Sequence, residues 1–187
     1  MPTPHFPSPL AVLIVGFLLP ACDGSPGFDP RTDGQLRVQY NGAVVGEFLA
    51  IGPPADALNS RRSFATAFYS AAGELQLCAY QHTGDGRGRF VILNVGRVTA
   101  PGTYMIPPGW AEGATSYQPG TFLFDVDASR TGVEHAFEFV QGAVTLETIA
   151  SERLAGTFAV STTGAELTGG SFDVLITTLE ELPVICV

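Results

Sequence analysis

The residue types that most often carry chemistry are sparse in this chain, and their spacing matches no metal or catalytic pattern. His82 and His135 lie far apart, and neither belongs to an HExxH or CxxC pattern. We expect each of them as a turn or surface residue. Asp125 and Asp127 are two residues apart on a predicted strand, so their carboxylates share one face. Calcium would need further oxygen ligands, which no EF-hand pattern supplies. The pair is interpreted as a solvated strand face, and the sequence predicts no metal and no cofactor.

Two other segments match catalytic or phosphate-binding loops only in part. The glycine-rich run His82–Arg89 lacks the Walker lysine and precedes a strand where a phosphate loop precedes a helix. It is predicted to be a hairpin turn, with Arg87 and Arg89 in solvent. Ser171 lacks the second glycine of a GxSxG nucleophile elbow. We therefore expect a protein that is not an enzyme, and a hydrolase with scattered catalytic groups is the alternative.

One loop has the composition of a binding site. The segment 107–120 (PPGWAEGATSYQPG) carries Trp110 and Tyr117 among glycines and prolines. Aromatic side chains on the loops of a rigid β scaffold can stack on sugars or peptides. The alternative is that Trp110 closes one end of the fold. Trp110 and Tyr117 are thus the predicted ligand contacts.

The N-terminal region has the pattern of an export leader. Leu10–Leu19 (LAVLIVGFLL) is apolar but shorter than the roughly 20 residues of a transmembrane helix. It ends in Leu19-Pro20-Ala21-Cys22, which resembles the lipobox of bacterial lipoproteins. The resemblance implies a diacylglycerol thioether on Cys22, cleavage after Ala21 and a lipid anchor at the cell envelope. An ordinary secretory signal with an incidental cysteine, or a retained core helix, are the alternatives.

This leader divides the chain into three parts. Residues 1–21 are expected to be the signal peptide, 22–34 a flexible Gly/Pro-rich tether, and 35–187 one domain. With Cys22 lipidated, Cys78 and Cys186 remain as an even number of cysteines in an oxidising compartment. We predict that they form a disulfide; two separate buried thiols are the alternative.

Composition limits the classes of partner. Hydrophobic residues make up 45% of the chain, which is enough for a sizeable core, and only 14% of residues are charged. The formal net charge is −9, and all nine basic residues are arginine. An acidic surface repels nucleic-acid phosphates and anionic lipid headgroups. The expected partners are therefore the membrane, through the lipid, and an envelope protein or glycan.

Short apolar runs separated by turn residues predict an all-β domain. The expected strands cover two runs of 36–48 around Asn41-Gly42, then 64–70, 74–81, 89–96, 102–106, 121–128, 136–150, 153–162 and 170–178. Leu75, Leu77 and Ala79 alternate with polar or smaller residues, which predicts a half-buried strand, whereas 89–96 is apolar on both faces and is placed centrally. Such spacing favours an antiparallel β-sandwich, and a closed β-barrel is the alternative.

A strand pattern in the last third carries a second resemblance. The segments GAVTL (142–146), AGTFAV (155–160) and GGSFDV (169–174) are similar to a succession of strands in bacterial lipoproteins of unknown function, as is the GTY start at 102–104. The resemblance implies a β-sandwich lipoprotein and no particular activity. We therefore expect a non-enzymatic envelope module for binding, interaction or structure, and a lipocalin-like carrier of a small hydrophobic ligand is the alternative.

Overall fold

The chain folds into ten strands and one short 3₁₀ helix within the residues that the structure describes. This computed structural model describes residues 29, 32–53, 62–84, 87–106, 121–127, 133–182 and 186, with only the backbone described for those between 121 and 136. The elements are β1 (Gly34–Gly42), β2 (Gly46–Gly52), β3 (Phe64–Tyr69), β4 (Leu75–Gly84), β5 (Arg87–Gly96), β6 (Gly102–Met105), β7 (Thr121–Asp127), β8 (Val133–Ile149), β9 (Arg153–Thr162), β10 (Ala165–Ile176) and η1 (Leu179–Glu181).

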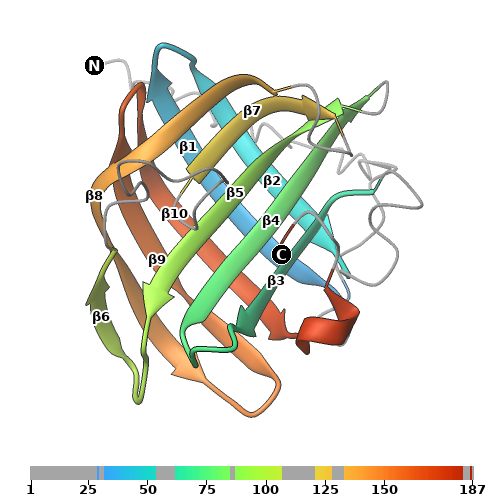
Figure 1. Cartoon of the computed structure of the whole chain (residues 1–187), viewed down its shortest axis with the longest axis vertical. Coiled ribbons are helices and arrows are strands. Elements are labelled where there is room, and N and C mark those ends of the chain that lie inside the picture. Colours follow the sequence, from blue (N-terminus) through green and yellow to red (C-terminus); the bar gives the residue numbers. More distant parts are fainter. Residues whose placement is uncertain are drawn as a thin grey trace, which may run out of the picture.

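The strands form one continuous sheet that curls around a common interior (Figure 1). Its order is β2-β1-β10-β3-β4-β5-β7-β8-β6, and β9 pairs with both β8 and β10. These pairings close a ring that runs from β10 through β3, β4, β5, β7, β8 and β9 back to β10. All of them are antiparallel except the short β10–β3 pair. The predicted all-β class is confirmed. The sequence favoured a sandwich and kept a closed barrel as the alternative. The strand pairings show a curled sheet whose strands pair in a closed ring.

Alternation along the strands fills the interior of this sheet. In β9, Leu154, Phe158 and Val160 point inward, while Thr157 and Ala159 are exposed. β5 is buried on both faces between β4 and β7, as predicted for a central strand. One cluster of buried side chains results, to which nearly every strand contributes: Leu36, Val38, Tyr40, Phe48, Ala50, Ala65, Ala67, Leu75, Leu77, Ala79, Val91, Leu93, Val95, Ile106, Phe137, Phe139, Val144, Leu146, Leu154, Phe158, Val160, Ala165, Leu167, Phe172 and Val174.

The glycines of the C-terminal strand pattern have a packing role. A Cβ at Gly156 would lie 2.8 Å from the ring of Phe172 and 2.1 Å from the Thr145 carbonyl oxygen. A Cβ at Gly170 would lie 2.7 Å from the ring of Phe158. The two rings thus lie over glycines of the neighbouring strand, with their centroids 6.4 Å apart. Packing between β9 and β10 therefore explains Gly156 and Gly170 of this pattern.

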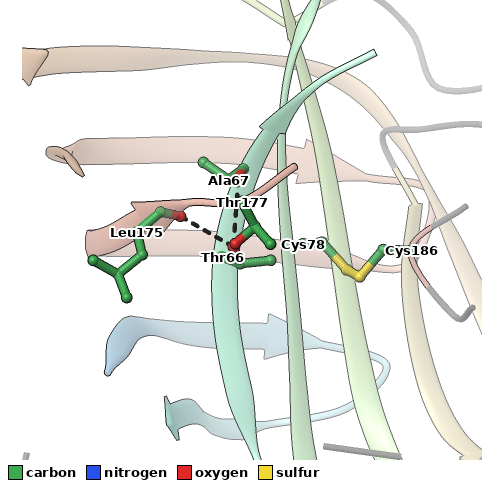
Figure 2. The surroundings of a disulfide bond; sticks show 6 residues. All are labelled: Thr66, Ala67, Cys78, Leu175, Thr177 and Cys186. Carbon is green, nitrogen blue, oxygen red and sulfur yellow. Dashed lines mark hydrogen bonds between the residues drawn. A yellow bond between two sulfur atoms is a disulfide. The ribbon is translucent and has the colours of Figure 1, made fainter. Parts of the chain in front are cut away.

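A second apolar cluster covers the outer face of β3, β4 and β5, where the prediction of a half-buried β4 is wrong. Every residue from Leu75 to Tyr80 is buried. The reason is the segment after β10, because Leu182 and Cys186 pack over the outward side chains of these strands. The full cluster is Phe64, Phe68, Cys78, Tyr80, Phe90, Ile92, Leu182 and Cys186. A disulfide between Cys78 and Cys186, with 5.9 Å between their Cα atoms, fastens that segment, as predicted (Figure 2).

The ring closes beside this disulfide through Thr66. β10 and β3 share only two residue pairs, Leu175 with Thr66 and Ile176 with Ala67. The Thr66 hydroxyl, buried in β3, lies 3.0 Å from the Leu175 carbonyl oxygen and 2.5 Å from the Thr177 hydroxyl. The Thr177 N–H donates to the Ala67 carbonyl at 2.8 Å. Since Thr66 is also the cross-strand partner of Cys78, closure and disulfide lie in the same part of the sheet (Figure 2).

Among the strand boundaries that differ from the predicted ones, two have a common cause. The first hairpin forms, but its turn lies at 43–45, after Asn41 and Gly42. These two residues continue β1 because they pair with Glu166 and Ala165 of β10. β10 in turn begins at Ala165, five residues before the predicted 170–178, with a bulge between Leu167 and Gly170. Both differences come from pairing with a strand that is remote in the sequence.

Candidate functional site

The predicted site residues lie mostly outside the described part of the chain. Cys22, Trp110 and Tyr117 are not among the described residues, so the anchor and the aromatic loop stay predictions. Asp125 and Asp127 lie on β7 and His135 on β8, and there only the backbone is described. Ser171 is exposed on β10 opposite Thr157. The predicted hairpin forms between β4 and β5, with Arg87 exposed, but His82 and Arg89 lie on the two strands and are half-buried. His82 leads to the candidate site.

The site is a groove at the place where β2 passes β3 and β4. β2 pairs with β1 on one side, and its end approaches the start of β3 so closely that a Cβ on Gly52 would lie 2.5 Å from the Ser63 carbonyl oxygen. A groove of about 430 Å³ opens here, which we call the seam groove. Its described lining is Asp33, Ile51, Gly52, Pro53, Arg62, Ser63 and His82. Four separate stretches of the sequence therefore meet at one place.

His82 and Ser63 are the central polar groups of the seam groove. The His82 backbone N–H donates to the Ser63 Oγ at 2.9 Å, which holds the serine against β4. The His82 side chain is half-buried, with its ring centroid 6.4 Å from that of Tyr80. Its Nδ1 is buried and has no hydrogen-bond partner among the described residues. Such a group costs about 1–3 kcal/mol when nothing satisfies it.

The two charged residues of the groove differ in how they are held. The Asp33 carboxylate accepts the Asp29 N–H at 2.9 Å and the Thr32 hydroxyl at 3.2 Å, and the Asp33 carbonyl accepts Arg153 at 3.3 Å. The Asp33 carboxylate is thus hydrogen-bonded to residues that immediately precede it in the sequence. Arg62 is exposed, and the structure records no ion pair or hydrogen bond of its guanidinium with a described residue. The Arg62 guanidinium is therefore available for hydrogen bonds or an ion pair with a ligand.

Arg89 lies on the interior side of β5 and is half-buried, which corrects its predicted position in solvent. Alternation along β5 places it on the same side as Val91 and Leu93. Its guanidinium lies 5.6 Å from the Tyr40 ring centroid and donates to the Glu47 carbonyl at 3.4 Å. The cation–π contact joins β5 to β1, which carries Tyr40, and the hydrogen bond joins β5 to β2, which carries Glu47.

The side chains of the groove suit binding. Serine, histidine and aspartate occur together here, but the described contact of Ser63 runs to the His82 backbone, and Asp33 is held by Asp29 and Thr32. A nucleophile relay needs the serine hydroxyl on the imidazole and the carboxylate on its other nitrogen. Among the described residues, no three histidine, cysteine or acidic side chains lie close enough to hold a metal. The same part of the chain contains no helix long and apolar enough to span a membrane.

The sequence singled out His82 but could not find the seam groove. Its lining comes from 33, 51–53, 62–63 and 82, which carry no shared motif.

Comparison with known proteins adds no family or fold relative. No protein-family model, curated protein or solved structure matches the chain.

Proposed function

We propose that the mature chain is an exported, lipid-anchored binding module whose ligand sits in the seam groove. The observation that carries the binding part is the groove itself, whose lining brings Arg62, Ser63 and His82 together from separate stretches of the sequence. A concave site with apolar walls and a few polar groups is the usual form of a small-molecule site. The curled sheet around it is a rigid support for such a site.

Binding is favoured over the two alternatives by the contacts described above. Hydrolysis would need a relay that Ser63 and His82 do not form. A lipocalin-like carrier would hold its ligand inside the sheet, where buried side chains from β1 to β10 form one packed cluster. Binding at the surface needs neither a relay nor an interior cavity.

The disulfide supports export. Cys78 is fully buried and Cys186 is 4% exposed, and both lie in the outer apolar cluster. Stable structural disulfides belong to oxidising compartments outside the cytoplasm. This agrees with a leader that ends at Cys22, from which the anchor is inferred.

Replacing Cys22 with alanine tests the anchor. We expect Cys22→Ala to move the protein from the membrane to the soluble fraction, because stable anchoring needs the acyl chains that this cysteine would carry. Mass spectrometry of the mature N-terminus should show cleavage after Ala21 and acylated Cys22 in the unchanged protein. Unmodified residues 1–21 in the purified protein, or Cys22→Ala that stays membrane-bound, would contradict the anchor.

A titration by NMR tests the binding. Small fragments of mixed charge are added to the mature, disulfide-bonded protein, and the backbone amides are followed. We expect saturable shifts at Ile51, Ser63 and His82, with Ser171 on β10 as an internal reference that does not move. Fragments that shift no groove amide would refute this assignment.

A further inference from the structure

We infer that the seam groove takes a small organic carboxylate; this rests on the proposed function and specifies its ligand. The inference comes from the balance of donors and acceptors on the groove lining. An anion of one charge and a short apolar body fits the lining better than a neutral molecule or a cation.

Donors to a ligand outnumber acceptors in the seam groove. Arg62 brings a guanidinium without a described partner, and its planar fork of N–H groups matches a carboxylate in two parallel hydrogen bonds. The Ser63 Oγ already accepts the His82 N–H, and no described contact uses its own hydrogen.

The acidic residue on the lining does not cancel these donors. Both oxygens of the Asp33 carboxylate accept hydrogen bonds from the turn at 29–32, Oδ2 from the Asp29 N–H and Oδ1 from the Thr32 hydroxyl. A cationic ligand would have to compete with these bonds and would face Arg62. The Asp33 carboxylate keeps its charge, but its oxygens already accept hydrogen bonds, whereas the Arg62 guanidinium has no described partner. Unused donors in the groove therefore favour a ligand that accepts hydrogen bonds, such as a carboxylate, at Arg62.

The remaining lining and the size of the groove define the body of the ligand. Ile51 and Pro53 supply apolar contact, and about 430 Å³ holds a small organic molecule. A polyanion such as a nucleic acid would be repelled by the acidic surface beyond the groove. One carboxylate on a compact hydrocarbon or aromatic body satisfies both conditions.

The test compares benzoate with benzamide, which has nearly the same shape and no charge. Both are titrated by NMR into the mature, disulfide-bonded protein, with the Ser63 amide and the His82 ring as reporters. We expect benzoate to bind at least tenfold more tightly than benzamide. Arg62→Gln should weaken benzoate at least tenfold and leave benzamide unchanged, because it removes the charge and keeps a similar length.

Arg97→Gln is the matched control. Arg97 is exposed after β5 and does not line the groove, so its substitution changes the net charge by the same amount at a different place. It should leave both affinities unchanged. Ser63→Ala is a second variant, which should weaken benzoate by several-fold while the amide spectrum stays folded. Equal affinity for the two probes, or full benzoate affinity in Arg62→Gln, would overturn the carboxylate inference. If neutral fragments alone shift the groove amides, the proposed binding function stands without this ligand class; if no fragment does, the function fails as well.

Discussion

Replacing Cys78 and Cys186 together with alanine removes the covalent link between β4 and the end of the chain. The link closes a loop across 108 residues of sequence and lies within the outer apolar cluster. Alanine is the better substitute than serine, because a hydroxyl in this cluster would add the cost of a buried polar group. The expected effect is a large loss of stability with the curled sheet retained.

The size of the loss follows from the loop. In the chain-entropy model a link across this separation lowers the entropy of the unfolded chain by about 16 cal/mol/K, which is about 5 kcal/mol at room temperature. For a domain of this size such a loss lowers the Tm by on the order of 10–20 °C. Contacts of Leu182 with the cluster keep part of the C-terminal segment in place. The buried cluster inside the sheet contains neither cysteine, so the sheet itself is expected to form.

Urea unfolding followed by circular dichroism measures the effect. The unchanged protein is compared with Cys78→Ala/Cys186→Ala, and Leu182→Ala serves as a control that loosens the same segment but keeps the bridge. The double variant should lose about 5 kcal/mol and show a larger m value, because its unfolded chain is more expanded. Leu182→Ala should lose about 2 kcal/mol with an unchanged m value.

A loss below about 1 kcal/mol in the double variant would refute this reasoning. It would mean that the apolar cluster and the β3–β10 closure hold the segment without the disulfide. A double variant that loses the β-sheet signal altogether would contradict the second expectation, namely that the interior core is sufficient for the sheet to form.

The remaining predictions concern the packing and closure of the sheet. Gly170→Ala should destabilise the fold by about 1–3 kcal/mol, measured by thermal unfolding, because its Cβ would lie 2.7 Å from the Phe158 ring; stability equal to the unchanged protein would contradict the packing role of this glycine. Thr66→Val should cost about 1–3 kcal/mol in the same assay, because it keeps the side-chain shape but leaves the Leu175 carbonyl and the Thr177 hydroxyl without this partner. Thr66→Ser retains the hydroxyl and should lose less, and equal losses for the two variants would show that the methyl group matters more than the hydrogen bonds.

Local pattern was sufficient for much of the fold. β9 runs over the predicted 153–162, and β7 agrees to within one residue with 121–128. The long strand predicted at 136–150 corresponds to β8, which also contains a register shift between Phe139 and Gln141. These features depend on alternating apolar residues and on turn residues that are close to them in the sequence. They can therefore be predicted from the sequence alone. The two cysteines available for pairing were likewise identified from their number and the expected compartment.

Tertiary structure alone decided the features that join remote segments. Burial of both faces of β4 requires the segment from Leu182 to Cys186, and extension of β1 through Gly42 requires Ala165 of β10. The parallel β3–β10 closure and the seam groove likewise bring together residues with no common motif. Periodicity reports which side of a strand is apolar, whereas the neighbour that covers that side is set by pairing across the whole chain. For this reason the sequence predicted a β domain with a disulfide, and the meeting of Arg62, Ser63 and His82 emerged only from the folded sheet.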